Sequence, residues 1–319
     1  MKDGDWYDWI FGRNNKYEEE KIKEEKMKLE GTYTAIVTPF RKNGVVDYDA
    51  FRKLIEMQIE AGVDGIVPVG TTGESPVLSF DEHKKVIEFV VKTVSRRTQV
   101  IAGTGANSTS EALELTRHAI DIGVDATLQV TPYYNRPSQE GLIKHFTAVA
   151  ELGAPVVLYN IPSRTGREIE VSTVVKLAQH PNIIGLKEAG GSVDRVSAIV
   201  TQCKITVLSG DDSLTLPMMA VGARGVISVA SNIIPGPIKK LTDHMLAGRL
   251  KEAMELHLKY YPLFRDLFID TNPVPVKAAL AMMGLIEEVY RLPLCEMSAA
   301  NKEKLRETLK KVGVPVISK

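Results

Sequence analysis

The chain of 319 residues is poor in cysteine, has no excess of charge and contains no long apolar run. Two cysteines, Cys203 and Cys295, cannot build a disulfide framework, so a reducing compartment is favoured and we expect the protein in the cytoplasm. The 40 basic residues balance the 40 acidic ones, which gives no electrostatic reason to expect binding to nucleic acid or to a membrane surface. No stretch approaches the ~18 apolar residues that span a bilayer, and a signal-peptide core is missing.

Signatures of metal and cofactor sites are also missing. The six histidines are scattered without the spacing of a zinc site. The glycine-rich segments GTTGES (70–75) and GTGANS (103–108) have neither the lysine of a phosphate-binding loop nor the spacing of a dinucleotide-binding fingerprint. Asp211 and Asp212 could hold a divalent cation, but such a pair more often caps a helix. We therefore expect no metal and no cofactor.

Tryptophan is scarce, and both copies lie in the first nine residues. Trp6, Trp9 and Ile10 fall at the i, i+3, i+4 spacing of one helix face. Residues 16–30 carry 11 charged side chains in 15, with i,i+4 ion pairs, and are predicted to form a solvated helix. We interpret residues 1–30 as an N-terminal extension, an aromatic segment followed by a charged helix. It either docks on a partner or another subunit, or folds back onto its own domain.

From Gly31 onward, short apolar runs alternate with amphipathic segments. Runs that are apolar throughout indicate strands buried on both faces, and hence a parallel sheet. Eight such strands separated by helices predict an α/β protein, with a (β/α)8 TIM barrel over residues 31–235. A doubly wound sheet is the rival, although it would normally have fewer strands. The runs lie at 34–38, 65–69, 100–103, 127–131, 156–160, 183–187, 206–210 and 225–229.

Further helical segments follow the eighth strand and predict a C-terminal helical subdomain over residues 236–319. They are expected at 241–247, 250–270, 275–288 and 298–312. Within the barrel, Ser79 with Glu82 and Ser108 with Glu111 have the spacing of capping boxes, and Asp47 precedes another amphipathic segment.

The active site of such a barrel forms where the strands end. Lys187 closes the run IIGLK and is predicted to point into the barrel mouth. A free lysine, with a pKa of about 10.4, is neutral in only roughly 0.04% of molecules at pH 7. Desolvation in the mouth favours the neutral amine, which is a nucleophile for carbonyl carbon. The alternative is a lysine that merely reaches solvent.

Other polar residues at the strand ends suit Schiff-base chemistry. Tyr159 on the adjacent strand could carry protons, and Thr71 and Tyr134 could extend a hydroxyl relay. Glycines around Thr71 free backbone N–H groups for a small carboxylate, and Arg164 offers a planar fork for a second one. Each of these residues has a simpler interpretation. The tyrosines could lie at the rim with their hydroxyls in water, the threonines could belong to an ordinary turn, and Arg164 could form a surface salt bridge.

Seven segments in order carry a resemblance to a known family. Together they resemble the dihydrodipicolinate synthases, which are pyruvate-dependent class I aldolases of the N-acetylneuraminate lyase superfamily. The resemblance runs from about residue 31 to the C-terminus. It implies a lyase that condenses pyruvate with L-aspartate 4-semialdehyde, in the diaminopimelate route to lysine. The segments are GTTGES (70–75), VTPYYNRPSQEG (130–141), YNIPSRTG (159–166), GLKEA (185–189), LSGDD (208–212), GVISV (225–229) and NPVPVK (272–277).

The resemblance also implies roles for individual residues. In that family the lysine matching Lys187 forms the Schiff base with pyruvate. The residues matching Thr71, Tyr134 and Tyr159 form the proton relay, in which the tyrosine at 134 reaches in from the neighbouring subunit. Members are commonly homotetramers built as dimers of dimers, so we expect at least a dimer here.

Substrate-binding roles follow in the same way. Thr72 matches a residue that binds the pyruvate carboxylate, and Gly210 and Ile227 match positions that line the pocket. Arg164 matches the arginine that receives the carboxylate of the aldehyde. Sister aldolases, acting on 2-keto-3-deoxy sugars or N-acetylneuraminate, share the barrel and the lysine. Arg164 with Thr165 and Gly166 follows the synthase pattern. A barrel scaffold that carries an N-terminal docking segment is the alternative from another class.

Members inhibited by lysine bind it in a pocket at the dimer interface, and this sequence matches that pocket in part. Phe80 stands where inhibited enzymes often carry histidine, and Pro76 where alanine is common. Packing at a subunit interface would explain the residues of the expected allosteric set equally well. It consists of Ser75, His83, Asn107, Glu111 and Tyr133.

Overall fold

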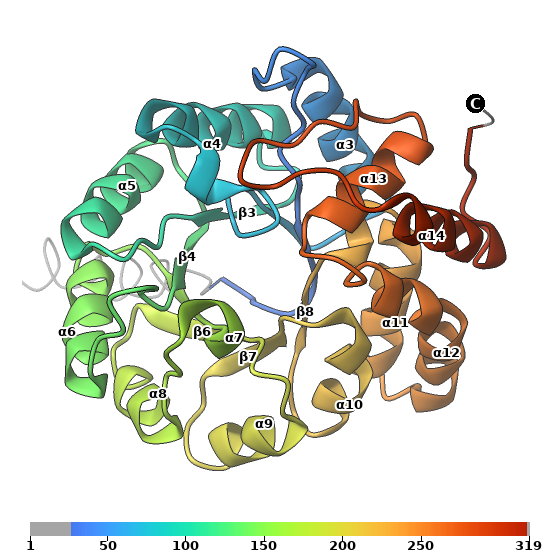
Figure 1. Cartoon of the computed structure of the whole chain (residues 1–319). Helices are drawn as coiled ribbons and strands as arrows, with labels where there is room; N and C mark the ends of the chain where they lie inside the picture. The colour runs from blue at the N-terminus through green and yellow to red at the C-terminus, as the bar shows by residue number, and fades with distance from the viewer. Residues whose placement is uncertain (1–26, 318–319) are drawn as a thin grey trace, which may run out of the picture.

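The computed structural model describes residues 27–317, and its eight strands close into a parallel barrel (Figure 1). Each strand pairs with the next one in the sequence, and β8 pairs with β1. The predicted (β/α)8 barrel is therefore confirmed. The strands are β1 (Gly31–Ala35), β2 (Gly65–Val67), β3 (Gln99–Gly103), β4 (Ala126–Val130), β5 (Val156–Asn160), β6 (Ile183–Glu188), β7 (Thr206–Ser209) and β8 (Gly225–Ser228).

A ring of helices surrounds the barrel (Figure 1). Its eighth helix is α11, which begins at the last residue of the predicted barrel range and otherwise lies in the range that we expected for the C-terminal subdomain. A one-turn helix, α7 (Pro162–Thr165), is inserted after β5. The ring comprises α3 (Tyr48–Glu60), α4 (Phe80–Val94), α5 (Thr109–Asp121), α6 (Gln139–Ala150), α8 (Val171–Leu177), α9 (Val193–Val200), α10 (Thr215–Ala220) and α11 (Pro235–Leu246).

Strand β1 begins three residues earlier than its apolar run predicts. The early part alternates threonine with Tyr33, and all of its side chains are buried. The hydroxyl of Thr32 bonds that of Thr242 at 2.8 Å, and Thr34 donates to Gln58 Oε1 at 2.7 Å. Because these buried hydroxyls find partners, the strand tolerates polar residues that hydrophobicity alone would exclude.

All three predicted helix starts are confirmed, because helices begin directly after Asp47, Ser79 and Ser108, and two of the three have the expected side-chain caps. The Asp47 side chain accepts from the N–H groups of Asp49 and Ala50, and Ser79 forms a reciprocal capping box with Glu82. The capping box at Ser108 is wrong. Its hydroxyl lies 2.8 Å from that of Ser110, and α5 has no side-chain cap there, because the neighbouring hydroxyl replaces the backbone N–H as its partner.

The charged helix and the aromatic face of Trp6, Trp9 and Ile10 lie outside the described residues, except for the last four positions of the predicted helix. Residues 27–30 are not helical and lead directly into β1. Leu29 is only 5% exposed, and its Cδ2 lies 2.3 Å from the position a Cβ on Gly185 would take. The prediction of a solvated helix is therefore wrong at Leu29, which is buried and closes the amino-terminal end of the barrel.

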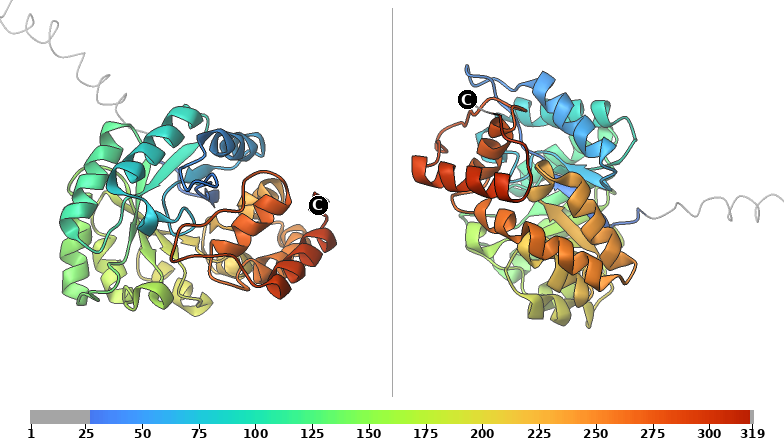
Figure 2. Two further views of the ribbon diagram at one scale, coloured as in Figure 1. Left: turned by 45° about the horizontal axis from the view of Figure 1, so that its top comes forward. Right: turned by 90° about the vertical axis from the view of Figure 1, so that its right-hand side faces the viewer.

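The C-terminal helices pack to one side of the barrel, as Figure 2 shows. They are α12 (Leu250–Asp266), α13 (Val274–Met282) and α14 (Ala299–Lys311). Thr308 of α14 donates to Asp266 Oδ2 of α12 at 2.6 Å, which ties these two helices together. The predicted helix over 275–288 ends at Met282, and irregular chain follows. Among the residues described, no helix has the length and apolar character to cross a membrane.

Candidate active site

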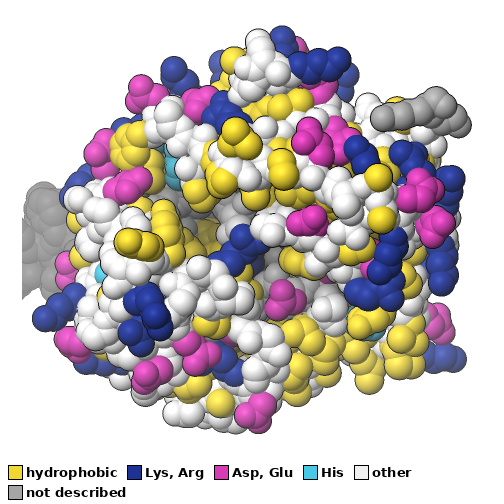
Figure 3. Space-filling model, in the orientation of Figure 1, with side chains coloured by type: hydrophobic (Ala, Val, Ile, Leu, Met, Phe, Trp, Pro, Cys, Tyr) yellow, Lys and Arg dark blue, Asp and Glu magenta, His cyan; other side chains and the backbone are white. Residues whose placement is uncertain are grey.

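Lys187 lies in the barrel interior, between Tyr159 of β5 and Leu208 of β7 in register. The side chain is 5% exposed, and its Nζ lies 4.3 Å from the centroid of the Tyr159 ring. Neighbouring residues in a strand point to opposite faces. Lys187 therefore faces inward while Glu188 faces the helices. This end of the molecule is hollowed near its centre, as Figure 3 shows.

Gly210 makes room for the lysine side chain. A Cβ at this position would lie 3.2 Å from Lys187 Cε, 3.1 Å from the carbonyl oxygen of Glu188 and 2.6 Å from Ala189 Cβ. Ile227 of β8 is fully buried and belongs to the same interior cluster as Tyr159. Gly210 thus lies beside the Lys187 side chain, and Ile227 lies in the same apolar cluster as its neighbour Tyr159.

A buried hydrogen-bond network around Glu188 joins the strand ends beside Lys187, and the sequence analysis did not predict it. Glu188 accepts from Arg195 Nε at 2.9 Å and from Asn160 Nδ2 at 2.9 Å, which joins β5, β6 and α9. The ion pair with Arg195 is almost wholly buried. Strand alternation next to Lys187 is the signal that could have identified Glu188 as a structural residue rather than a catalytic one.

Asp211 and Asp212 follow β7 and have different surroundings. Burial raises the pKa of Asp211 to about 6, and the positive charge of Lys187 opposes that rise. Asp212 accepts from Ser228 Oγ at 2.5 Å and from the N–H groups of Val229 and Ala230 at 3.1 and 2.9 Å. It therefore caps the short helix after β8, a distant segment, rather than the helix that follows it directly.

The turn over residues 70–75 carries both threonines. Thr71 and Tyr159 line one small cavity of about 30 Å³, so the structure brings these two hydroxyl-bearing residues together. Thr72 is buried, and its hydroxyl accepts from Asn272 Nδ2 at 3.0 Å. A Cβ on Gly73 would come within 2.9 Å of Val69 N, so this turn needs glycine for space.

Arg164 lies on α7 and meets the same asparagine. Its Nη2 donates to the carbonyl oxygen of Asn272 at 2.8 Å. Asn272 therefore contacts both candidate carboxylate-binding residues, Thr72 through its side chain and Arg164 through its backbone. Its only signal in the sequence was its place in the NPVPVK segment.

Tyr134 does not join Lys187 within this chain. It is 91% exposed and has a left-handed backbone, with φ of 71°. A large aromatic side chain this exposed extends away from its own domain. This is the arrangement that a residue completing the site of another copy would need.

Four of the five candidate allosteric residues line one cavity of about 350 Å³, together with Pro76 and Phe80. His83 Nε2 lies 2.7 Å from the carbonyl oxygen of Gly103, and burial lowers the pKa of this imidazole to about 4. Burial and the charge of Glu111 both raise the pKa of Tyr133. Asn107 is absent from this lining, and its carbonyl oxygen accepts from Asn135. The lining residues of the allosteric set are Ser75, His83, Glu111 and Tyr133.

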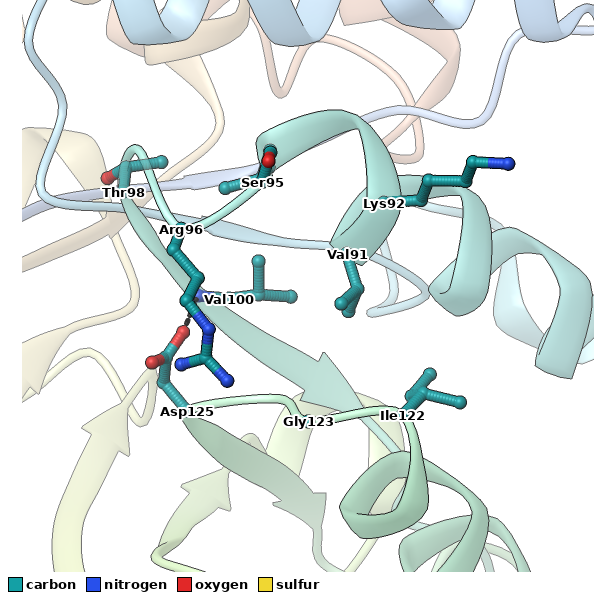
Figure 4. Close-up of a pocket in the computed structure, with 10 residues that line it drawn as sticks. Val91, Lys92, Ser95, Arg96, Thr98, Val100, Ile122, Gly123 and Asp125 are labelled. Carbon is teal, nitrogen blue, oxygen red and sulfur yellow. Dashed lines mark hydrogen bonds between the residues drawn. The ribbon is translucent and has the colours of Figure 1, made fainter.

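Another cavity, of about 390 Å³, lies at the opposite end of the strands (Figure 4). Asp125 sits at the start of β4 and accepts from the N–H of Val100 at 2.7 Å, and Arg96 lies beside it. Because catalytic groups of these barrels gather at the carboxyl ends of the strands, this cavity is no part of the candidate site.

Comparison with known proteins shows one consistent likeness. The sequence profile of the Dihydrodipicolinate synthetase family matches residues 28–312. The 4-hydroxy-tetrahydrodipicolinate synthase of Hydrogenobaculum is 54% identical over 289 residues, which is 90% of this chain and 99% of that protein. The crystal structure of dihydrodipicolinate synthase from Aquifex aeolicus has a TM-score of 0.89 and 52% identity, covering 91% of this chain and 100% of the other. The enzyme from Cyanidioschyzon merolae, solved with lysine bound, has a TM-score of 0.87 and 41% identity, covering 90% and 99%.

Proposed function

Because this chain belongs to the dihydrodipicolinate synthetase family, we propose that it condenses pyruvate with L-aspartate 4-semialdehyde, as a 4-hydroxy-tetrahydrodipicolinate synthase does. The observation that carries the proposal is Lys187, buried at the end of β6 beside Tyr159 and the cavity that Thr71 also lines. A buried amine with hydroxyl groups nearby is the arrangement that Schiff-base formation requires.

The chemistry proceeds through a covalent bond to Lys187. Its neutral amine attacks C2 of pyruvate, the amine proton passes to the carbonyl oxygen, and loss of water leaves the Schiff base. Removal of a methyl proton gives an enamine, whose carbon bonds to the aldehyde carbon of the second substrate while the aldehyde oxygen takes up a proton and becomes a hydroxyl. The amino group of that adduct then attacks the Schiff-base carbon, its proton passes to Nζ, and the bond from that carbon to Nζ breaks, which releases the Lys187 amine. Tyr159 and Thr71 move the protons, because they line the same cavity.

Carboxylate recognition falls to two other residues. Thr72, at the 70–75 turn, binds the pyruvate carboxylate, with Gly210 and Ile227 lining the pocket. Arg164 presents its guanidinium to the carboxylate of the aldehyde substrate, in the planar geometry that suits a bidentate contact.

The exposed Tyr134 completes the relay of a neighbouring subunit, and the active form is a homotetramer built as a dimer of dimers. Its 91% exposure in the single chain supports this assignment. Sedimentation should show a tetramer. Tyr134→Phe should keep the assembly and slow turnover, and an active monomer would contradict the proposal.

The cavity of about 350 Å³ near Tyr133 is the proposed regulatory site for lysine, since four of the expected residues line it. A relative solved with lysine bound supports this assignment. Calorimetric titration with lysine should show binding that Glu111→Gln weakens. An unmodified enzyme that neither binds lysine nor slows in its presence would leave these residues as interface packing.

Borohydride trapping tests the central proposal. Pyruvate should be fixed covalently on one lysine, and mass spectrometry of the digested protein should locate it at Lys187. Lys187→Ala should abolish trapping, and unchanged stoichiometry in this variant would refute the mechanism. Turnover of aspartate semialdehyde against keto-deoxy sugars separates the synthase from its sister aldolases. Arg164→Ala should impair the former strongly and the latter little.

The N-terminal extension needs its own test as a docking segment. Deletion should stop at residue 26, because Leu29 belongs to the barrel. If activity and oligomer size persist while binding to a partner is lost, the extension docks; a fall in melting temperature alone indicates that it packs on the domain.

A further inference from the structure

A buried ion pair joins the turn at 70–75 to the C-terminal helices. Lys277 of α13 donates to Glu74 Oε1, and neither side chain is exposed to solvent. The Lys277 Nζ also lies 4.2 Å from the centroid of the Phe40 ring and 5.5 Å from that of Tyr290. Burial lowers the pKa of Lys277, and the nearby charge of Glu74 opposes this effect.

A buried ion pair of this kind adds little to the free energy of folding. Removing two charges from water is costly, and apolar residues of similar volume often serve a fold as well. Glu74 Oε2 has no hydrogen-bond partner within residues 27–317, although it is buried. Glu74 also has a left-handed backbone, with φ of 56°, which is uncommon for a residue with a side chain. The surrounding contacts must hold this conformation in place.

The other two side-chain hydrogen bonds to the turn come from Asn272, in the same distant segment as Lys277, and from Thr38, which follows β1. Asn272, five positions before Lys277, donates to the Thr72 hydroxyl, and Thr38 donates to the carbonyl oxygen of Gly73 at 2.7 Å. Two of these three side-chain contacts therefore arise about 200 residues later in the sequence.

We propose that the Glu74–Lys277 pair is a positioning device for the pyruvate site. It fixes the 70–75 turn against α13, so that the Thr72 hydroxyl faces the bound carboxylate. This inference rests on the proposed function and extends that function by making the C-terminal helices part of substrate recognition. Lys277 touches no reacting atom and acts only through Glu74 and the turn.

The test uses the double variant Glu74→Gln/Lys277→Met, which removes both charges and so avoids stranding either one. We expect the KM for pyruvate to rise about tenfold, because a loosened turn no longer presents the Thr72 hydroxyl. The KM for the aldehyde should change by less than about threefold, since Arg164 keeps its bond to the Asn272 carbonyl. The same rise should appear in the pyruvate concentration that half-saturates borohydride trapping.

Thr308→Val is the matched control, because it removes a buried hydrogen bond from the same C-terminal helices without touching the turn. It should lower the melting temperature and leave both KM values unchanged. Glu74→Gln/Lys277→Leu, which also removes both charges, provides a second variant if the first one folds poorly. A pyruvate KM within about twofold of the unmodified enzyme in the folded variants would overturn the positioning role.

Borohydride trapping of the unmodified enzyme distinguishes failure of this inference from failure of the proposed function. If pyruvate is trapped on Lys187 but the variants saturate normally, this inference fails and the proposed function stands. If the unmodified enzyme is not trapped at all, the proposed function fails and the inference falls with it.

Discussion

Gly210→Ala adds one methyl group beside Lys187, the proposed Schiff-base lysine, and its consequences follow from three distances. The new Cβ would lie 2.6 Å from Ala189 Cβ, 3.1 Å from the Glu188 carbonyl oxygen and 3.2 Å from Lys187 Cε. Carbon atoms in good contact are about 3.5–4.0 Å apart, so the contact with Ala189 is short by about 1 Å. No left-handed backbone is involved at Gly210, so space alone decides the outcome.

Overpacking of this kind costs about 1–3 kcal/mol, which lowers the melting temperature of a barrel this size by roughly 1.5–5 °C. The effect on chemistry should be larger. The Lys187 side chain must move by several tenths of an ångström, and misplacement of a reacting group by about 1 Å can cost on the order of 100-fold in rate. We expect the rate of borohydride-trappable adduct formation to fall about 10- to 100-fold.

Ala189→Gly offers a compensating change within the same contact. The double variant Gly210→Ala/Ala189→Gly removes the shortest contact and should recover most of the melting temperature. It keeps the contact with Lys187 Cε, so adduct formation should stay slow. If the single variant traps pyruvate as fast as the unmodified protein, or if the double variant recovers full speed, Gly210 does not act by making room for the lysine.

Three further predictions concern pH and packing. Burial raises the pKa of Asp211 to about 6 from 3.8, so its stabilising contribution is complete below about pH 3.8 and is lost as the pH rises through about 6. Asp211→Asn should therefore raise the melting temperature relative to the unmodified protein at pH 7.5 and leave it unchanged below pH ~3.8, and equal curves at both values would contradict this. Hydrogen bonds from Arg291 lower the pKa of Glu82 to about 2 from 4.5, so this stabilisation is present above about pH 4.5 and is lost as the pH falls through about 2. Urea denaturation should show Glu82→Gln less stable by about 1 kcal/mol at pH 7, with the gap closing toward pH 2; a gap that is constant with pH would show that the pair does not titrate as described. Leu29→Ala should lower the free energy of unfolding by about 3 kcal/mol, and a neutral Leu29→Ala would show that the residue does not seal the barrel.

Much of the architecture was predictable because barrel strands are buried on both faces. Each such strand is a short apolar run, and the place where it ends locates residues such as Lys187 and Tyr159 without knowledge of any contact. The same rule explains the misplaced start of β1. Thr32 lies before the predicted run and is polar yet buried, and its hydroxyl partner Thr242 on α11 makes that possible.

The parts that were not predicted depend on contacts between distant residues. Nothing near Asn272 or Lys277 in the sequence shows that they meet Thr72 and Glu74, about 200 positions away. Leu29 is a single apolar residue in a charged stretch, and its burial follows from the open end of a barrel that closes around it. Ser108 shows the same limit on a short scale, because a competing hydroxyl two residues away decides its bonding.

The position of Leu29 has a practical consequence. The chain enters the barrel through its closed floor, whereas the proposed substrate site at Lys187 lies at the other end of the strands. Anything attached ahead of residue 27, such as a tether to a solid support or a second enzyme, therefore leaves the substrate route open. A linker joined after residue 30 would instead remove the leucine that seals the floor.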